Sequence, residues 1–409
     1  MFLQVVTFLF YIDKINPQEY FLSLHLGYKC KVFNKIQFPF TLTEDKALKK
    51  TLAALLSVAV LLAGAVSAEA KITLKVANSG PDTPANRTVC AADVYTDAVK
   101  KATNGEVELV FYHASKLGGE AEALEGIQMG TIDMGTLTSG PAANFFPQTM
   151  AFDIPYLISS NAAGWEFLKS DFVKKLSAEF CKKTGVRILA IAEHGYRHFT
   201  AKGAELRTPA DMKGLKMRVM ENPAHMAMTR GLGSSPTPIP YSELYMALQQ
   251  GVVDGMECPI ANIHDHKFYE VQDSMVLDGH LYGPLLIFIN EDKFQSLSKA
   301  QQEALYKGAE AFCTVHAGIT AASDATALKN MAAKGVKIHA LSADEQKMFR
   351  EAAQPAALEV IAKRIGKEWV EGAVKAADEA AAKVAGKEQQ MLEECMKQAQ
   401  EMVKVARGQ

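Results

Sequence analysis

Apolar and polar positions follow two different periods along the chain, and the order of those periods predicts an α/β fold. Residues 72–77 and 106–112 alternate apolar and polar with a period of two, as strands do. A helical period separates them at about 86–102 and returns at about 117–130, before a third strand at 132–137. This β-α-β-α-β order predicts parallel strands covered by helices.

A second α/β unit is predicted to begin near residue 195, after a helix at about 162–184 and a strand at 186–192. Its strands are expected at residues 196–200, 215–219, 252–257 and 285–289, and its helices at 208–214 and 241–251. Beyond them, nearly all of the chain to residue 409 has a helical pattern. Apolar residues between 358 and 374 recur at helical spacing, which indicates a packed helical tail.

A signal peptide is predicted near the N-terminus. The cationic segment Lys46–Lys50 precedes the apolar run Leu52–Val66, and small residues follow. The run has about 15 residues, fewer than the roughly 20 that a spanning helix needs, so we expect export rather than a membrane anchor. Cleavage is expected near Ala68 or Ala70, which predicts a periplasmic protein.

The residues before this signal are unusual, because a signal peptide normally begins a protein. Two interpretations are open for Met1–Asp45: the start was assigned too far upstream, or Met1–Phe10 is the first part of a two-part leader. We favour the first interpretation. In either case residues 1–70 are expected to be removed, and the fold is expected to begin at Lys71.

Size and charge exclude several classes of protein. The chain has 409 residues, of which 48% are hydrophobic and 22% charged, which is enough for two packed domains. Residues 71–409 carry 37 basic and 41 acidic side chains, so no nucleic-acid partner is expected. Five cysteines lie in this part, at separations of at least 55 residues: Cys90, Cys181, Cys258, Cys313 and Cys395. This odd number does not describe a disulfide framework, and buried free thiols are expected.

No motif of an enzyme or a metal site is found. The exported part contains no GxSxG, HExxH, P-loop or GxGxxG pattern, so we expect no catalytic residues and no cofactor. His264 and His266 are two residues apart, and such residues do not share a helix face. No metal ligands are therefore expected.

One arginine stands out as a candidate for binding an anion. In the predicted strand 215–219, the period of two places Met217 and Val219 on one face and Arg218 on the other. An arginine held on a strand by packed neighbours presents a planar fork that matches a carboxylate in two parallel hydrogen bonds.

Six linked motifs resemble the DctP family of TRAP transporter substrate-binding proteins, and the resemblance runs from about residue 72 to at least residue 322. The motifs are Leu117-Gly-Gly-Glu120, Gly195-Tyr-Arg197, Asp211-Met-Lys-Gly-Leu-Lys-Met-Arg218, Ser235-Pro-Thr-Pro-Ile-Pro-Tyr-Ser-Glu-Leu-Tyr245, Ala247-Leu-Gln-Gln-Gly-Val-Val-Asp-Gly-Met-Glu257 and His266-Lys-Phe-Tyr-Glu270. Their order and spacing match the family.

The resemblance implies a two-lobed periplasmic binding protein fold. Each lobe is an α/β sheet flanked by helices, with chain crossovers between the lobes and a helical C-terminal tail. Lobe I is expected to comprise residues 71–194 and about 284–323. Lobe II is expected to comprise residues 195–283 and about 324–409, including the C-terminal helices.

The resemblance also implies where the ligand binds. In the family, the arginine at the position of Arg218 makes the paired contact to the ligand carboxylate, and the arginine at Arg197 bonds the same group or a neighbouring oxygen. Tyr241 matches an aromatic position that packs over the ligand. From the first lobe, loops reach the ligand at the positions of Asn78, Thr138 and Ser139.

Two departures leave the identity of the ligand open. Sialic acid binders that resemble this chain have Glu near Thr138, and they have Asn where this chain has Cys258. A thiol is only weakly polar, which favours a smaller or less hydroxylated acid. Sugar acids, C4-dicarboxylates, hydroxy acids and aromatic acids remain as candidate ligands.

The function expected from this resemblance is that of an extracytoplasmic solute receptor, not of an enzyme. Its partners would be a small carboxylate ligand and the membrane subunits of a TRAP permease, and a monomer is expected. The alternative is a bilobed binding protein of an ATP-driven transporter or a chemosensory system, because fold does not dictate partner. A secreted enzyme is the less favoured alternative.

Overall fold

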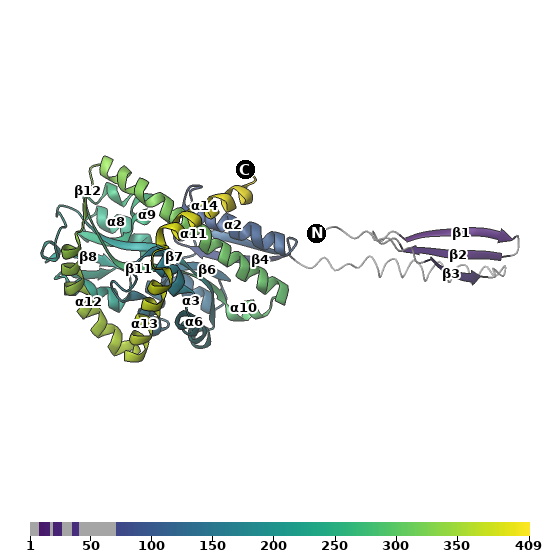
Figure 1. Cartoon of the computed structure of the whole chain (residues 1–409), viewed down its shortest axis with the longest axis horizontal. Coiled ribbons are helices and arrows are strands. Elements are labelled where there is room, and N and C mark those ends of the chain that lie inside the picture. The colour runs from purple at the N-terminus through teal and green to yellow at the C-terminus, as the bar shows by residue number, and fades with distance from the viewer. Residues whose placement is uncertain (1–7, 17–18, 27–34, 41–70) are drawn as a thin grey trace. The chain divides into compact units, whose positions relative to one another are not determined.

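The computed structural model describes residues 8–16, 19–26, 35–40 and 71–409 (Figure 1). The chain divides into two compact units at residue 70. In the first, β1 (Phe8–Asn16), β2 (Glu19–Leu26) and β3 (Lys35–Phe40) form an antiparallel sheet in which β2 is central. The predicted signal peptide and its cleavage site lie outside the described residues. No helix in the described part is long and apolar enough to cross a membrane.

The second unit is built on one sheet of nine strands. Eight of them follow one another in the order β5-β4-β6-β11-β7-β10-β8-β9, and β12 pairs with β11. The strands are β4 (Ile72–Asn78), β5 (Val107–Tyr112), β6 (Met134–Thr138), β7 (Val186–Ala201), β8 (Lys216–Val219), β9 (Ser235–Pro238), β10 (Gly255–Pro259), β11 (Ser274–Asn290) and β12 (Lys337–Ala340). Strand β4 is parallel to β5 and β6, which confirms the pairing predicted from the β-α-β order.

Two long strands, β7 and β11, run through the whole sheet and connect its halves. The C-terminal half of β11 pairs with β6 on one side and with the N-terminal half of β7 on the other. The N-terminal half of β11 pairs with the C-terminal half of β7, and this half of β7 also pairs with β10. We call the part built on β4, β5 and β6 the first lobe, and the part built on β8, β9 and β10 the second lobe. Between them, Gly195 has a positive φ of 101° and lies opposite Gly283.

This continuity differs from the sequence-based expectation in one respect. The pattern predicted two separate strands at 186–192 and 196–200, but the structure forms one strand through Gly195. The pattern also missed residues 274–284 of β11, because Gly279, Gly283 and Pro284 interrupt the alternation. The register of β11 on β7 shifts on either side of Gly283, so these residues form bulge-like irregularities within a continuous strand pair.

Helices cover both faces of the sheet (Figure 1). Those of the first two hundred residues are α2 (Arg87–Ala102), α3 (Glu120–Gln128), α4 (Ser139–Ala142), α5 (Asn161–Leu168) and α6 (Asp171–Thr184). The single helix predicted at 162–184 is therefore two helices. The break occurs because the Ser170 side chain accepts a hydrogen bond from the backbone N–H of Val173 and so caps a new N-terminus.

The remaining helices include the long α11, which packs against α2. They are α7 (Pro223–Gly231), α8 (Leu244–Gln249), α9 (Ile260–Asp265), α10 (Glu291–Gln295), α11 (Lys299–Ala333), α12 (Ala343–Ile365), α13 (Lys367–Val384) and α14 (Glu388–Arg407). At Gly308 of α11, a Cβ atom would lie 2.7 Å from Cε2 of Tyr95 and 3.0 Å from Cγ2 of Val99 in α2. Glycine therefore permits the close approach of the two helices.

The C-terminal helices contact elements of both lobes. Helix α12 packs against α7, α13 packs against α5, and α14 packs against α11 and α2. Helices α5 and α2 belong to the residue range predicted for lobe I. The division of the chain into residues of lobe I and lobe II stays a prediction.

Candidate functional site

Arg218 lies on β8, between two residues that fix the strand in the core. Met217 and Val219 are completely buried, and Arg218 itself is only 2% exposed. Its Nε donates to the carbonyl oxygen of Ile239 at 2.8 Å, while its Nη1 is buried without a hydrogen-bond partner. Among the described residues, no carboxylate lies within 4.0 Å of this guanidinium. Arg218 is therefore a buried cation with a free donor, as an anion site requires.

Arg197, on β7, already forms an ion pair with Glu257. Its Nε and Nη2 donate to the carboxylate of Glu257, with Nη2 at 2.9 Å from Oε1, and Nη2 also donates to the carbonyl oxygen of Glu257 at 2.7 Å. Strands β7 and β10 are adjacent and antiparallel, which brings the two side chains together. The direct contact of Arg197 with a ligand carboxylate stays a prediction.

Glu257 is the centre of a buried network that the sequence did not reveal. Nδ1 of His225 lies 3.5 Å from Oε1 of Glu257, and Nε2 of His280 lies 3.4 Å from Oε2. The other ring nitrogens contact Asp153 at 3.1 Å and Asp278 at 2.8 Å. Burial opposes ionisation of Glu257, but Arg197 and the two histidines together hold its pKa well below the usual range. The network keeps Glu257 charged and Arg197 fixed.

Tyr241 lies at the start of the short 3₁₀ helix η3 (Tyr241–Glu243), against the guanidinium of Arg218. The Cζ atom of Arg218 is 5.9 Å from the centre of the Tyr241 ring. The hydroxyl of Tyr241 accepts a hydrogen bond from Nδ2 of Asn262 at 3.1 Å, and His266 packs edge-on at 4.8 Å between ring centres. Two of the predicted site residues therefore meet at this position.

Cys258 is also part of this cluster. Its Sγ lies 3.8 Å from Nη2 of Arg197, and the side chain is buried. Burial raises the pKa of the thiol, so the group is neutral at pH 7. The structure thus brings Arg218, Arg197, Tyr241 and Cys258 together in the second lobe.

The predicted residues of the first lobe are engaged by their own neighbours. Asn78, at the end of β4, donates to Oγ1 of Thr136 at 2.9 Å and contacts Nδ1 of His113 at 3.0 Å. Thr138 holds the carboxylate of Glu120 through its backbone N–H at 3.1 Å and through its hydroxyl. Ser139 is buried at the start of α4. Their contact with a ligand stays a prediction.

The two lobes touch beside Arg218. The Thr138 hydroxyl lies 3.6 Å from Sδ of Met220, two residues beyond Arg218. Nδ2 of Asn144 donates to the carbonyl oxygen of Glu221 at 2.7 Å. These contacts connect the loops after β6 with the residues after β8, so the structure has its lobes closed on each other at this place.

Arg87 is a functional candidate that the sequence did not indicate. It is the first residue of α2 and is 4% exposed. Its Nη2 donates to Oδ1 of Asn262 in the second lobe, and its Nη1 is buried without a partner. The side chain lines a cavity of about 20 Å³ together with Asn78, His194 and His266. An arginine at the start of a helix carries no sequence signal, because its surroundings come from distant segments.

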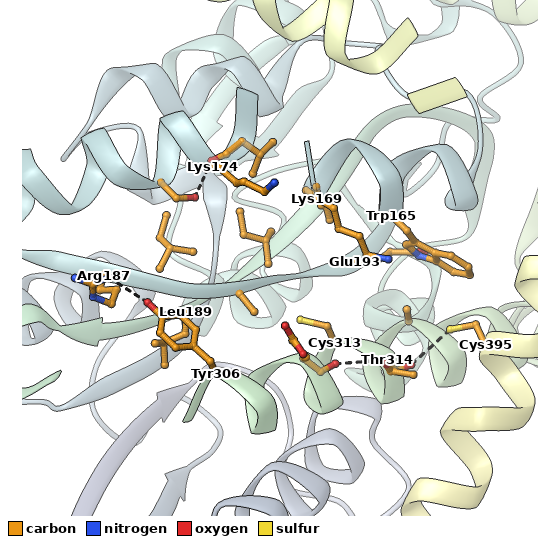
Figure 2. A pocket seen from close by; sticks show the side chains of 18 of the residues that line it. Trp165, Lys169, Lys174, Arg187, Leu189, Glu193, Tyr306, Cys313, Thr314 and Cys395 are labelled. Carbon is orange, nitrogen blue, oxygen red and sulfur yellow. Dashed lines mark hydrogen bonds between the residues drawn. The ribbon is translucent and has the colours of Figure 1, made fainter. Parts of the chain in front are cut away.

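A large pocket lies elsewhere and contains none of the predicted site residues. It has a volume of about 1040 Å³ and is lined by side chains of α5, α6, β7, α11 and α14 (Figure 2). Trp165 and Asn161 both donate to Glu193 here, and Glu193 is almost fully buried. Burial raises the pKa of Glu193 to about 7. Volume alone therefore does not identify the ligand site.

Comparison with known proteins gives the family. Residues 82–364 match DctP, the bacterial extracellular solute-binding protein family 7. The chain is 33% identical to the 2,3-diketo-L-gulonate-binding periplasmic protein YiaO of Escherichia coli strain K12, over 61% of this chain and 75% of that protein. It is 31% identical to the C4-dicarboxylate-binding periplasmic protein DctP of Rhodobacter capsulatus, over 73% and 88%.

A solved structure supports the same assignment. The sugar acid binding protein DctPAm from Advenella mimigardefordensis, in complex with galactonate, matches with a TM-score of 0.73 and 27% identity. The match covers 76% of this chain and 99% of that one. Since the family match also spans more than half of the sequence, the chain belongs to the DctP family of TRAP transporter solute-binding proteins.

Proposed function

We propose that this protein is the extracytoplasmic receptor of a TRAP transporter, that it binds a small organic acid anion between its lobes through Arg218, and that it delivers this anion to the permease. The observation that carries the proposal is the buried guanidinium of Arg218, which has an unpartnered Nη1 and no carboxylate partner. A buried cation is costly unless an anion compensates it, so the ligand carboxylate is the natural partner.

The relatives support an organic acid as the ligand. Their names specify 2,3-diketo-L-gulonate and C4-dicarboxylates, and the solved structure contains galactonate. In this chain, Arg218 is buried, the Tyr241 ring lies near its guanidinium, and Cys258 is close enough for Arg218 to lower the pKa of its thiol. An arginine–carboxylate pair in such surroundings contributes more than the roughly 0–1 kcal/mol of an exposed ion pair.

Arg197 has a supporting role in this proposal. Because Glu257 occupies its Nε and Nη2, Arg197 presents little free donor capacity to a ligand in the closed structure. The pair is close to electrically neutral, so the charge that attracts the ligand in the second lobe comes from Arg218.

Ligand binding is expected to favour the closed arrangement. A ligand makes its full contacts only when both lobes reach it, and it therefore shifts the equilibrium from open to closed. The contacts of Thr138 with Met220 and of Asn144 with Glu221 belong to the closed arrangement. The permease would then recognise this form. The periplasmic location rests on the signal peptide predicted at residues 46–70.

The test is a thermal-shift screen over organic acids with the purified exported chain. A ligand at one hundred times its dissociation constant stabilises by about 2.7 kcal/mol. Arg218→Gln should weaken binding of the ligand on the order of 100-fold, because truncation leaves a buried carboxylate unpaired. Arg230→Gln, an exposed arginine on α7, is the matched control and should bind normally.

Two results would contradict the proposal. One is an Arg218→Gln variant that unfolds at the same temperature as the unliganded wild type and still binds with full affinity. The other concerns the partner: an ATPase gene beside this gene, in place of a small and a large membrane subunit, would favour an ATP-driven transporter.

A further inference from the structure

We propose that Arg87 is a second anion anchor, contributed by the first lobe, and that the ligand carries two negatively charged groups, one for Arg218 and one for Arg87. This inference rests on the proposed function, because it takes Arg218 as the site of the first carboxylate. It goes further in naming a ligand residue that the family motifs do not contain and in narrowing the ligand to dianionic acids.

The first argument is the balance of buried charge. In the described part of the chain, Arg87, Arg197 and Arg218 are the arginines with less than 5% exposure. Arg197 is neutralised by Glu257, but neither Arg87 nor Arg218 has a carboxylate within 4.0 Å. Each of these two also has a buried Nη1 without a hydrogen-bond partner. Nearby acids attract both arginines from a distance, but neither guanidinium has a carboxylate in contact, and a ligand with two anionic groups would supply both contacts.

The second argument is that both guanidinium groups belong to one cluster. Arg87 donates to Asn262, and Asn262 donates to the Tyr241 hydroxyl, whose ring faces Arg218. Burial raises the pKa of Tyr241, and the charges of Arg218 and Arg87 both act against that rise. The Tyr241–Asn262 pair thus lies between an arginine of the second lobe and an arginine of the first.

The third argument is the space in front of Arg87. The cavity of about 20 Å³ is also lined by Asn78, Asn262 and His266. A cavity needs roughly 10–15 Å³ to hold one water molecule, so this one accommodates a single group of that size. A carboxylate oxygen has about this size, and the guanidinium of Arg87, whose side chain lines the cavity, would donate to it.

The acids that face Arg87 do not replace a ligand. Asp265 accepts a hydrogen bond from Asn86 at 2.9 Å. Glu193 accepts hydrogen bonds from Asn161 at 2.6 Å and from Trp165. Asp324 attracts Arg87 from a distance, and burial raises the pKa of this carboxyl to about 6. None of the three forms an ion pair with Arg87. The competing explanation is that their combined field balances Arg87 and that Arg87 only holds the lobes together through Asn262.

Matched acids that differ in one carboxylate distinguish the two explanations. The probes are succinate against butyrate and galactarate against galactonate, measured by calorimetry with the wild-type exported chain. We expect a diacid to bind on the order of tenfold or more tightly than its monoacid, as a charge-assisted pair would give. This comparison needs no variant. Equal binding of both members of each pair, or no binding of either diacid, would overturn the inference.

A variant then assigns the effect to Arg87. Arg87→Gln should remove the preference for the diacid and leave binding of the monoacid within about threefold, since one charged hydrogen-bonding contact is lost. Arg230→Gln should change neither. An equal loss for both acids would show a structural role for Arg87 and overturn the inference. If monoacids bind and lose affinity only in Arg218→Gln, the proposed function stands and this inference fails.

Discussion

The buried pair of Arg197 and Glu257 gives a sharp test of how the site is held together. Replacing Glu257 by glutamine keeps the shape of the side chain and removes its charge. Glu257 is completely buried and accepts hydrogen bonds from Nε and Nη2 of Arg197. The substitution leaves the Arg197 cation buried without a counter-charge. Breaking a buried ion pair from one side costs about 3–5 kcal/mol, so we expect a loss of unfolding free energy of about that size.

The pH dependence of this loss follows from the lowered pKa of Glu257. A carboxyl with a lowered pKa stabilises the fold above its unfolded value of 4.5, and this contribution disappears as the pH falls through the lower folded value. The difference between wild type and Glu257→Gln should therefore be largest near pH 5 and shrink below pH 4.5. It should also shrink as the pH rises above 6.5, because Glu257 raises the pKa of His225 and His280, and a raised histidine pKa stabilises the fold only at pH values below it.

Urea denaturation followed by circular dichroism measures the effect, with the exposed Glu371→Gln as the matched control. A double-mutant cycle with Arg197→Met completes the experiment. Because the second substitution removes the stranded cation, the double variant should lose less than the sum of the single losses. A change within about 0.5 kcal/mol for Glu257→Gln, as at an ordinary surface position, would refute the reasoning.

Two further predictions concern the buried side chains of Glu193 and Cys258. Because the pKa of Glu193 is raised to about 7, the wild type loses stability as the pH rises from about 4.5 through 7. Glutamine does not ionise, so the free energy of unfolding of Glu193→Gln relative to wild type should increase by about 3 kcal/mol between pH 4.5 and pH 8. Urea denaturation at both pH values measures this difference. An equal difference at both pH values would contradict this. Cys258→Asn should alter ligand preference without unfolding the protein, and unchanged affinities across an acid panel would count against it.

The fold was largely predictable because it depends on local periodicity. The predicted two-lobed α/β architecture is confirmed by the sheet and by the solved relatives. The period of two also located the strand of Arg218 and the core face of Met217 and Val219. It did not predict that Arg218 itself is buried. That burial comes from Ile239 and Tyr241, which follow in the sequence and cover the other face of the strand.

The partners within the site were not predictable, because they are set by pairings between distant segments. Glu257 reaches Arg197 only through the register of β10 on β7, 60 residues apart in the chain. Arg87 reaches Asn262 across 175 residues. No local pattern encodes such distances. By contrast, the division of the helix at 162–184 had a local signal, since Ser170 is a good N-cap residue.

The continuity of β7 and β11 also limits how this molecule can come apart. Each strand supplies backbone partners to both lobes, so no single cut of the chain yields two complete sheets. A fragment that contained one lobe would expose the unpaired edges of two strands, which favour aggregation. We therefore expect residues 71–409 to lose their structure in one cooperative transition. We also expect the ligand that joins the lobes to protect both of them equally against proteolysis.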